Sequence, residues 1–337
     1  MMENTLYLNL RGLGVKFGIL LLLTLLIGCA MTSKNDYRNE GPRIHNLAPA
    51  FIEYGNIIEG KSIDEQMKQL KSTFFPKFPE FYQYKIDKWV KAGKNPDEEL
   101  IKQLQEYQQI KTEFAQKTRD ISANLEDTIK SFTEAFPDLD KNFDVYIIHS
   151  FGEMDGGMRT IGGKSVFILG IDGMVKYHKG FTSEVPFFHH ELFHVYHAQF
   201  LPDNHGIWLS LWSEGLATYI SKKLNPNASL KEMLLGLPEG MTEDIKKTWD
   251  YHWKDLSSKL TSAKDEDYES YFLFSSKHKK IIKRAGYYLG YLIAEEIGKT
   301  KTVTEMAKMS SNEVLPLIKK AIHTIQTTSA VSSNQSH

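Results

Sequence analysis

The feature that most constrains this chain is a short run near its middle, residues 188–194, which reads Phe-His-His-Glu-Leu-Phe-His. On an α-helix, His190 and His194 are four positions apart, so both imidazoles project from one face and can share a metal ion. Glu191 lies about 100° further round the helix, where its carboxylate can reach a water beside the ion instead of the ion itself. The run therefore predicts a helix that carries two metal ligands and a general base.

A third ligand follows in the sequence. A catalytic zinc site has three protein ligands and one open position. Glu214 stands 20 residues after His194, in a segment, 207–220, that is typical of a largely buried helix with one acidic residue. Buried histidines and glutamates need partners, and a metal ion provides them. The spacing alone leaves one alternative, in which these side chains are hydrogen-bonded core residues.

The two motifs together, His-Glu-x-x-His and then Glu-Gly-Leu-Ala, resemble the gluzincin branch of zinc metallopeptidases, the group of thermolysin. The sequence around the glutamate looks most like that of the predicted zinc-dependent proteases of that superfamily, and the resemblance covers residues 160–220 approximately. It implies that His190, His194 and Glu214 hold Zn²⁺ and that Glu191 is the general base.

Two positions depart from known patterns. The thermolysin group has an Asp four residues after the ligand glutamate that orients a zinc histidine, whereas this chain has Thr218. The resemblance therefore implies that this support comes from elsewhere. The third histidine of metzincins would fall at Phe200. His197 lies about 10 Å along the helix from His190, too far to join the same ion, and is expected to be a polar residue near the cleft.

The surroundings of the motif predict an α+β fold. Residues 143–149 and 163–172 have the β-branched and aromatic composition of strands, and the glycine-rich link 152–163 is typical of a turn or bulge. The resemblance implies a zincin-like metallopeptidase core with a small mixed sheet, the active-site helix and C-terminal helices, preceded by an all-helical N-terminal region. It also makes residues 163–170 the candidate strand that lines the cleft and pairs with extended substrate.

A helix is predicted at 279–298, closed by a glycine, with Gly286 and Gly290 on one face for close packing. Peptide hydrolysis needs a donor to the oxyanion, and gluzincins commonly use a Tyr or His from the C-terminal part of the chain. The first candidate is Tyr287; the alternative is that the aromatic residues here belong to the core. Further candidates are Tyr288, Tyr291 and His278.

The N-terminus predicts export. Two cations, Arg11 and Lys16, precede the apolar run 19–27, which is too short to span a bilayer and has the length of a signal-peptide core. The run ends in Leu-Ile-Gly-Cys, which resembles the bacterial lipobox, so Cys29 is the predicted lipidation site. It is the only cysteine, which excludes an internal disulfide. The resemblance implies a lipid anchor on the extracytoplasmic side of the cell envelope, at the outer membrane if the cell is Gram-negative; an ordinary signal peptide is the alternative.

The remaining chain divides by composition. The predicted segments are a signal peptide (1–28), a tether (29–48), a helical N-terminal region (49–136), a metallopeptidase domain (137–325) and a disordered tail (326–337). Lys and Arg total 41 against 42 Asp and Glu, a net charge of −1 that does not favour nucleic acid as a partner. The basic run 277–284 is typical of a solvated face, and could also meet an acidic substrate or lipid headgroups.

These observations predict a membrane-anchored zinc metallopeptidase that acts on peptides or proteins. Two alternatives stay open: a zinc lipoprotein that assembles envelope proteins without catalysis, and a metallohydrolase that cleaves cell-wall or other non-peptide amides.

Overall fold

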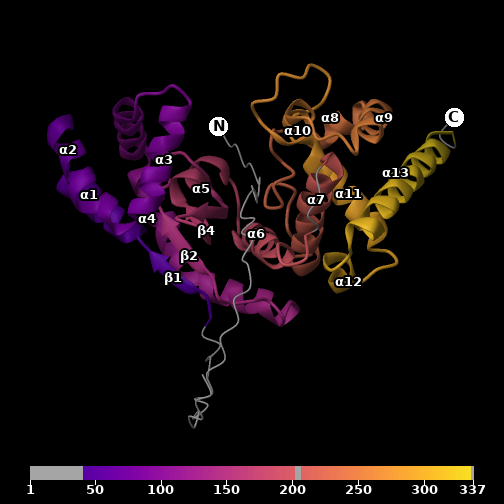
Figure 1. Ribbon diagram of the computed structural model, residues 1–337, viewed down its shortest axis with the longest axis horizontal. Coiled ribbons are helices and arrows are strands. Elements are labelled where there is room, and N and C mark those ends of the chain that lie inside the picture. The colour runs from indigo at the N-terminus through magenta and orange to yellow at the C-terminus, as the bar shows by residue number, and fades with distance from the viewer. Residues whose placement is uncertain (1–40, 202–205, 335–337) are drawn as a thin grey trace, which may run out of the picture.

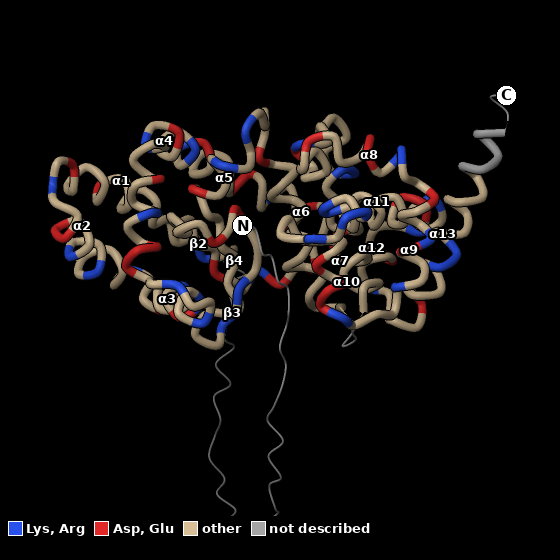
Figure 2. Tube along the Cα trace, turned by 90° about the horizontal axis from the view of Figure 1, so that it is seen from above, with Lys and Arg blue, Asp and Glu red and all other residues tan. Residues whose placement is uncertain are grey.

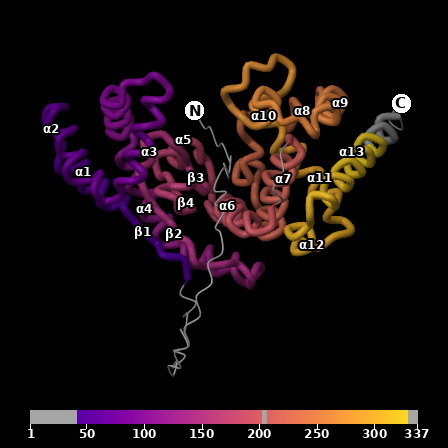
Figure 3. The backbone as a smooth tube through the Cα atoms, in the orientation of Figure 1, coloured from indigo at the N-terminus to yellow at the C-terminus, as the bar shows by residue number. Residues whose placement is uncertain are grey.

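The structure of the protein is a computed structural model that describes residues 41–201 and 206–334. Helices surround one small mixed sheet, which confirms the predicted α+β class. Figure 1 shows two lobes, with the sheet and the first helices in one and α7 to α13 in the other. Helix α6 (Val185–His197) lies between the lobes at the base of the gap, as Figure 3 also shows.

The sheet has four strands in the order β1-β2-β4-β3. Their bounds are β1 (Arg43–Asn46), β2 (Asp144–Ile148), β3 (Gly156–Ile161) and β4 (Lys164–Gly170). β1, β2 and β4 are parallel, and β3 runs antiparallel to β4. β4 is therefore paired on both sides and cannot accept a further strand, so the prediction that 163–170 pairs with substrate is wrong. β3, formed by part of the predicted glycine-rich turn, is the edge strand beside β4, and β1 is the other edge.

β1 also corrects the predicted tether, because part of 29–48 belongs to the sheet. Arg43 pairs with Asp144 through two hydrogen bonds of 2.8 and 2.9 Å, and the backbone N–H of Leu47 donates to the carbonyl of Ile147 at 2.9 Å. The Asn46 side chain accepts from the backbone N–H of Ala48, the first residue of the first helix. Cys29 and the rest of 1–40 lie outside the described residues.

The part of the chain that connects β1 to β2 is helical. Its helices are α1 (Ala48–Ile57), α2 (Ile63–Gln69), a short π-helix (Leu70–Phe74), a short 3₁₀-helix (Phe75–Lys77), α3 (Pro79–Lys91) and α4 (Pro96–Ala135). The 40-residue α4 begins where the Asn95 side chain accepts from the N–H of Asp97, with Pro96 in its first turn. Phe51, Phe74 and Tyr107 meet edge to face and join these helices into one aromatic core.

The second lobe is helical. Its elements are α7 (Ile207–Leu224), α8 (Met241–Lys247), α9 (Trp249–Lys259), α10 (Asp265–Phe272), α11 (Ala285–Ile297), α12 (Val303–Ala307) and α13 (Ser311–Asn334). The short helix α5 (Ile171–Tyr177) directly follows β4. The predicted disordered tail is wrong for 326–334, because α13 is anchored by buried Val314, Ile318 and Ile322 and continues beyond them. In the described residues no helix is long and apolar enough to cross a membrane, and Figure 2 shows charges of both signs interspersed over both lobes.

Helices α7 and α11 cross at two glycines. A Cβ on Gly215 would lie 2.1 Å from the carbonyl carbon of Gly290, and one on Gly290 would lie 2.5 Å from the carbonyl oxygen of Leu211. The backbones therefore touch at Gly290, one of the two glycines predicted for close packing, whereas Gly286 faces the ring of Phe272. The helix predicted over 279–298 begins only at Ala285. Its start is delayed because Arg284 has a left-handed φ of 63°.

We expect Gly215→Ala to destabilise the protein by about 1–3 kcal/mol, because its methyl group would overlap backbone atoms that cannot move independently. Gly41→Ala is the control, since a Cβ at that position would meet nothing within 4 Å. Urea unfolding measures both variants. Equal stability of the two would show that the helices separate at little cost.

Candidate metal centre

The two predicted histidine ligands stand on α6, which is buried from Pro186 to His197. His190 and His194 point to one side, and their Nε2 atoms lie 3.0 Å apart. His189 contacts Ser131 at 3.0 Å and Asn225 at 2.9 Å and does not belong to this pair. The four-residue spacing therefore has the consequence expected of it.

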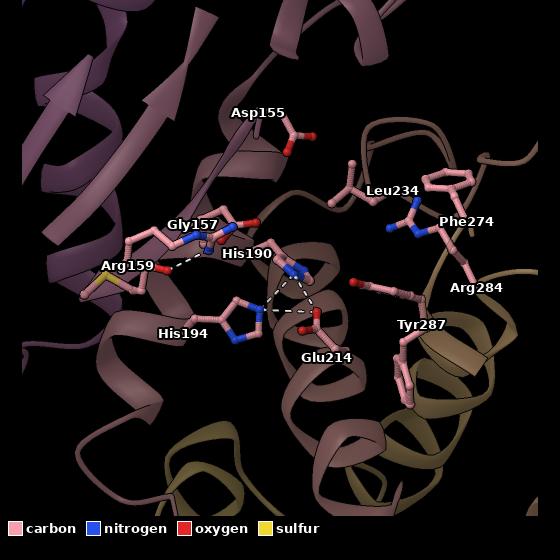
Figure 4. Close-up of a pocket in the computed structure, with 13 residues that line it drawn as sticks. Asp155, Gly157, Arg159, His190, His194, Glu214, Leu234, Phe274, Arg284 and Tyr287 are labelled. Carbon is pink, nitrogen blue, oxygen red and sulfur yellow. Dashed lines mark hydrogen bonds and ion pairs between the residues drawn. The ribbon is translucent and has the colours of Figure 1, made fainter. Parts of the chain in front are cut away.

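Glu214 comes from α7 and completes the group. Its Oε2 lies 3.3 Å from the Nε2 atoms of both His190 and His194, and one ligand atom from each residue falls within 4.8 Å of the others (Figure 4). Burial acts to raise the pKa of Glu214, but the charge of His194 and hydrogen bonds from both histidines outweigh it and lower that pKa. Two imidazoles and a carboxylate at this separation could hold a metal ion.

A hydroxyl group lies near the Nδ1 atom of each histidine, on the side of the ring away from the Glu214 carboxylate. Thr218 Oγ1 donates to the carbonyl of Glu214 at 2.8 Å and lies 3.4 Å from His190 Nδ1, so it can accept the Nδ1–H. Ser213 Oγ lies 3.4 Å from His194 Nδ1. A proton on each Nδ1 leaves each Nε2 lone pair free for a metal. The sequence predicted that a residue other than Thr218 orients the zinc histidine. This prediction is wrong for His190, because the Thr218 hydroxyl reaches its ring.

We expect Thr218→Val to weaken metal binding about 10- to 100-fold, because the near-isosteric side chain cannot accept from His190. Competition with a chelator of known affinity measures the change. Thr128→Val is a matched control, since Thr128 is also buried and its hydroxyl also donates to the carbonyl four residues earlier, but on α4. An unchanged metal affinity for Thr218→Val would mean that the 3.4 Å contact does not orient the ring.

Glu191 lies beside the ligands, buried to 5% exposure, and is not one of the three residues of the metal group. Burial raises its pKa to about 7, and the nearby carboxylates of Glu214 and Asp155 act in the same direction. Gly157 of β3 lies against the Glu191 carboxylate: a Cβ at that position would be 3.4 Å from Glu191 Oε2, and the φ of 132° disfavours any other residue. The glycine thus brings the backbone of β3 directly against the carboxylate.

The ligands open onto a cavity whose walls come from both lobes. Its lining residues are Asp155, Gly157, Met158, Arg159, His190, Glu191, His194, Glu214, Leu234, Phe272, Phe274, Arg284 and Tyr287. The edge strand β3 forms one wall and α11 with its preceding loop forms the other (Figure 4). The cavity therefore brings together the edge strand β3, the group His190, His194 and Glu214, and Glu191.

Tyr287, the first candidate donor, lies in this cavity, and Figure 4 shows its hydroxyl directed toward His190 and Glu214. It stands one turn before Gly290, so the close helix crossing brings it to Glu214. The lower-ranked candidates do not line the cavity: Tyr291 donates to Glu295 at 2.7 Å, and His278 Nδ1 accepts from the N–H of Ile281 at 2.9 Å.

Two charged residues on the β3 side of the cavity, Asp155 and Arg159, were not predicted from the sequence. Asp155 contacts His178 Nε2 at 3.1 Å, and Glu184 contacts the other ring nitrogen at 2.6 Å. Burial acts to lower the pKa of His178, but these two carboxylates raise it to about 9. Arg159 Nε lies 3.7 Å from Glu153, which is itself buried. These residues are separated from the motif in sequence and carry no spacing signal that could have revealed them.

His197 is not at the cleft. It is buried, its Nδ1 has no hydrogen-bond partner in the described part of the chain, and burial lowers its pKa to about 3. A neutral histidine among apolar residues of α6 is a core residue, so the expectation of a polar residue near the cleft is wrong. The reason is that α6 is buried along its whole length, leaving no solvent-facing side for His197.

Neither protein-family models, nor curated proteins, nor solved structures match this chain.

Proposed function

We propose that this protein is a zinc-dependent metallopeptidase, in a zincin-like fold, that hydrolyses peptide bonds with Glu191 as general base. The observation that carries the proposal is the convergence on one cavity of the group His190, His194 and Glu214, a buried glutamate beside it, and an antiparallel strand edge. A purely structural histidine cluster accounts for the first of these features but not for the other two.

The donor set fits Zn²⁺. Two imidazoles and one carboxylate are a common protein ligand set of a catalytic zinc, and the hydroxyls near both Nδ1 atoms match the orientation that such ligands need. His190, His194 and Glu214 would hold the ion. When bound, Zn²⁺ supplies Lewis-acid chemistry, which polarises a carbonyl and lowers the pKa of water toward neutrality.

The side chains around the ligands have distinct tasks. Glu191 takes a proton from the attacking water on its carboxylate and returns it to the leaving amine. The Tyr287 hydroxyl donates to the oxyanion that develops on the substrate carbonyl. β3 offers backbone N–H and C=O groups to an extended substrate, and Phe272, Phe274 and Leu234 help to exclude water from the cavity.

The test is metal content combined with turnover. We expect the purified protein to contain about one zinc per chain, to cleave a peptide library, and to lose both properties in His194→Ala. His323→Ala, an exposed histidine on α13, is the control that should retain both. A folded protein that takes up no zinc after reconstitution would contradict the proposal. Zinc without peptide cleavage would favour a binding role in envelope assembly or hydrolysis of a cell-wall amide, which muropeptide substrates distinguish.

We also propose that the enzyme is held on the extracytoplasmic side of a bacterial membrane by lipid on Cys29, a residue outside the described ranges. The support is the lipobox-like ending of the apolar run. Cys29→Ser should release the protein from the membrane fraction of the expressing cell.

A further inference from the structure

Arg284 forms part of the cavity wall opposite β3. It belongs to the basic run 277–284 that is typical of a solvated surface, yet its exposure is only 4%. Its φ of 63° lies in the left-handed region, which residues with a side chain rarely adopt. Figure 4 shows the guanidinium turned toward the cavity, across from Gly157 and Arg159.

The guanidinium is held by aromatic rings and one carbonyl. It lies 4.2 Å from the ring centroid of Tyr287 and 5.0 Å from that of Phe274, and its Nη1 donates to the carbonyl of Leu237 at 3.3 Å. Within residues 41–201 and 206–334, no carboxylate oxygen lies within 4.0 Å of its nitrogens. The rings and the carbonyl fix the plane of the group, and the carbonyl uses only one of its five N–H donors.

A buried cation without a counter-ion is costly, because neither water nor an opposite charge replaces its hydration. The other charges near the cavity are already matched: Asp155 contacts His178, and Arg159 lies near Glu153. Arg284 is therefore the cation that a ligand can satisfy. A planar guanidinium with free donors fits the two oxygens of a carboxylate.

We propose that Arg284 binds a carboxylate of the substrate, so that this site selects peptides with a carboxylate close to the bond that is cut. The inference rests on the proposed peptidase function and deepens it. The carboxylate has two sources, the C-terminus of the peptide or the side chain of an internal Asp or Glu. The first would make the protein a carboxypeptidase, and the second an endopeptidase for acidic sequences.

Binding separates recognition from turnover. The probes are acetyl-Ala-Ala-Phe as free acid and as amide, and acetyl-Ala-Ala-Glu-Ala-Ala-amide with its Gln counterpart. They are titrated calorimetrically into the zinc-loaded full chain carrying Glu191→Gln. We expect the carboxylate member of one pair to bind about tenfold more tightly or better, and the pair that shows the difference identifies the source.

Arg284→Gln in the same background should abolish that difference, and Arg284→Lys should retain part of it. Because the comparison is made first between ligands, it does not depend on whether an Arg284 variant folds. Equal affinity within both pairs overturns the inference. Wild-type cleavage of the peptides without preference for either carboxylate leaves the peptidase function standing and removes only the role of Arg284. Failure of wild type to cleave any peptide counts against the proposed function itself.

Discussion

Glu191→Gln should abolish peptide hydrolysis and leave the zinc content at that of the wild type. The amide keeps the size of the side chain but cannot accept a proton, and Glu191 is not one of the three residues of the metal group. Loss of a general base typically lowers turnover about 10²- to 10⁴-fold. Metal analysis and peptide cleavage on the same preparation measure both quantities.

Glu65→Gln is the control for this variant. Glu65 closes the capping box of α2 by accepting from the backbone N–H of Ser62, a role that glutamine can fill, and it is far from the cavity in sequence and fold. Hydrolysis that persists in zinc-loaded Glu191→Gln would remove Glu191 from the mechanism. Loss of zinc in the variant would instead mean that the carboxylate helps to hold the ion.

Glu153→Ala should cost about 3–5 kcal/mol of the free energy of unfolding. The Glu153 side chain contacts Lys85 Nζ at 2.9 Å and Lys88 Nζ at 2.8 Å, and it lies near Arg159 of β3. Lys85 is only 6% exposed, so removal of the carboxylate leaves a buried charge without its partner. Urea unfolding at pH 7 measures the loss. Glu59→Ala, which breaks an ion pair whose glutamate is 72% exposed, should cost well under about 1 kcal/mol.

The pH dependence of this loss has a definite sign. Burial acts to raise the pKa of Glu153, but the charges of Lys85 and Lys88 outweigh it and lower the pKa below its ordinary value. A group with a lowered native pKa stabilises the fold above its unfolded pKa, and the effect disappears as the pH falls through the native value. The stability difference between wild type and Glu153→Ala should be full at pH 7 and shrink below about pH 4.3. A difference that grows on acidification would contradict this account.

The metal group could be predicted because its geometry is mostly local. His190 and His194 are one turn apart on a helix, so their common direction follows from the helical repeat alone. Predicting Glu214 as the third ligand required only that a second buried helix pack beside the first. The edge position of β3 could not be foreseen, because strand order depends on pairings between distant segments. In this sheet β4 took the interior position and left the glycine pair at 156–157 on the edge.

Arg284 illustrates a different difficulty. Local composition placed it in a basic, solvated run, and nothing in the sequence distinguishes it from Lys283. Its burial follows from the approach of α11 to α7 at Gly215 and Gly290, together with the rings of Phe274 and Tyr287. Such burial is a tertiary property. β1 was missed for the same reason, since its partner strand begins about a hundred residues later.

The pairing of β1 with β2 has a consequence for how the chain folds. Arg43 and Asp144 are 101 residues apart in the sequence, so the pairing of β1 with β2 closes a long loop of chain that contains α1 to α4. Helices form from neighbouring residues on the microsecond scale, whereas non-local strand pairing must first overcome the entropy of a long loop. During synthesis, β1 has no partner until β2 has emerged. The helices α1 to α4 can therefore collapse first, and the strand that precedes them joins the sheet late.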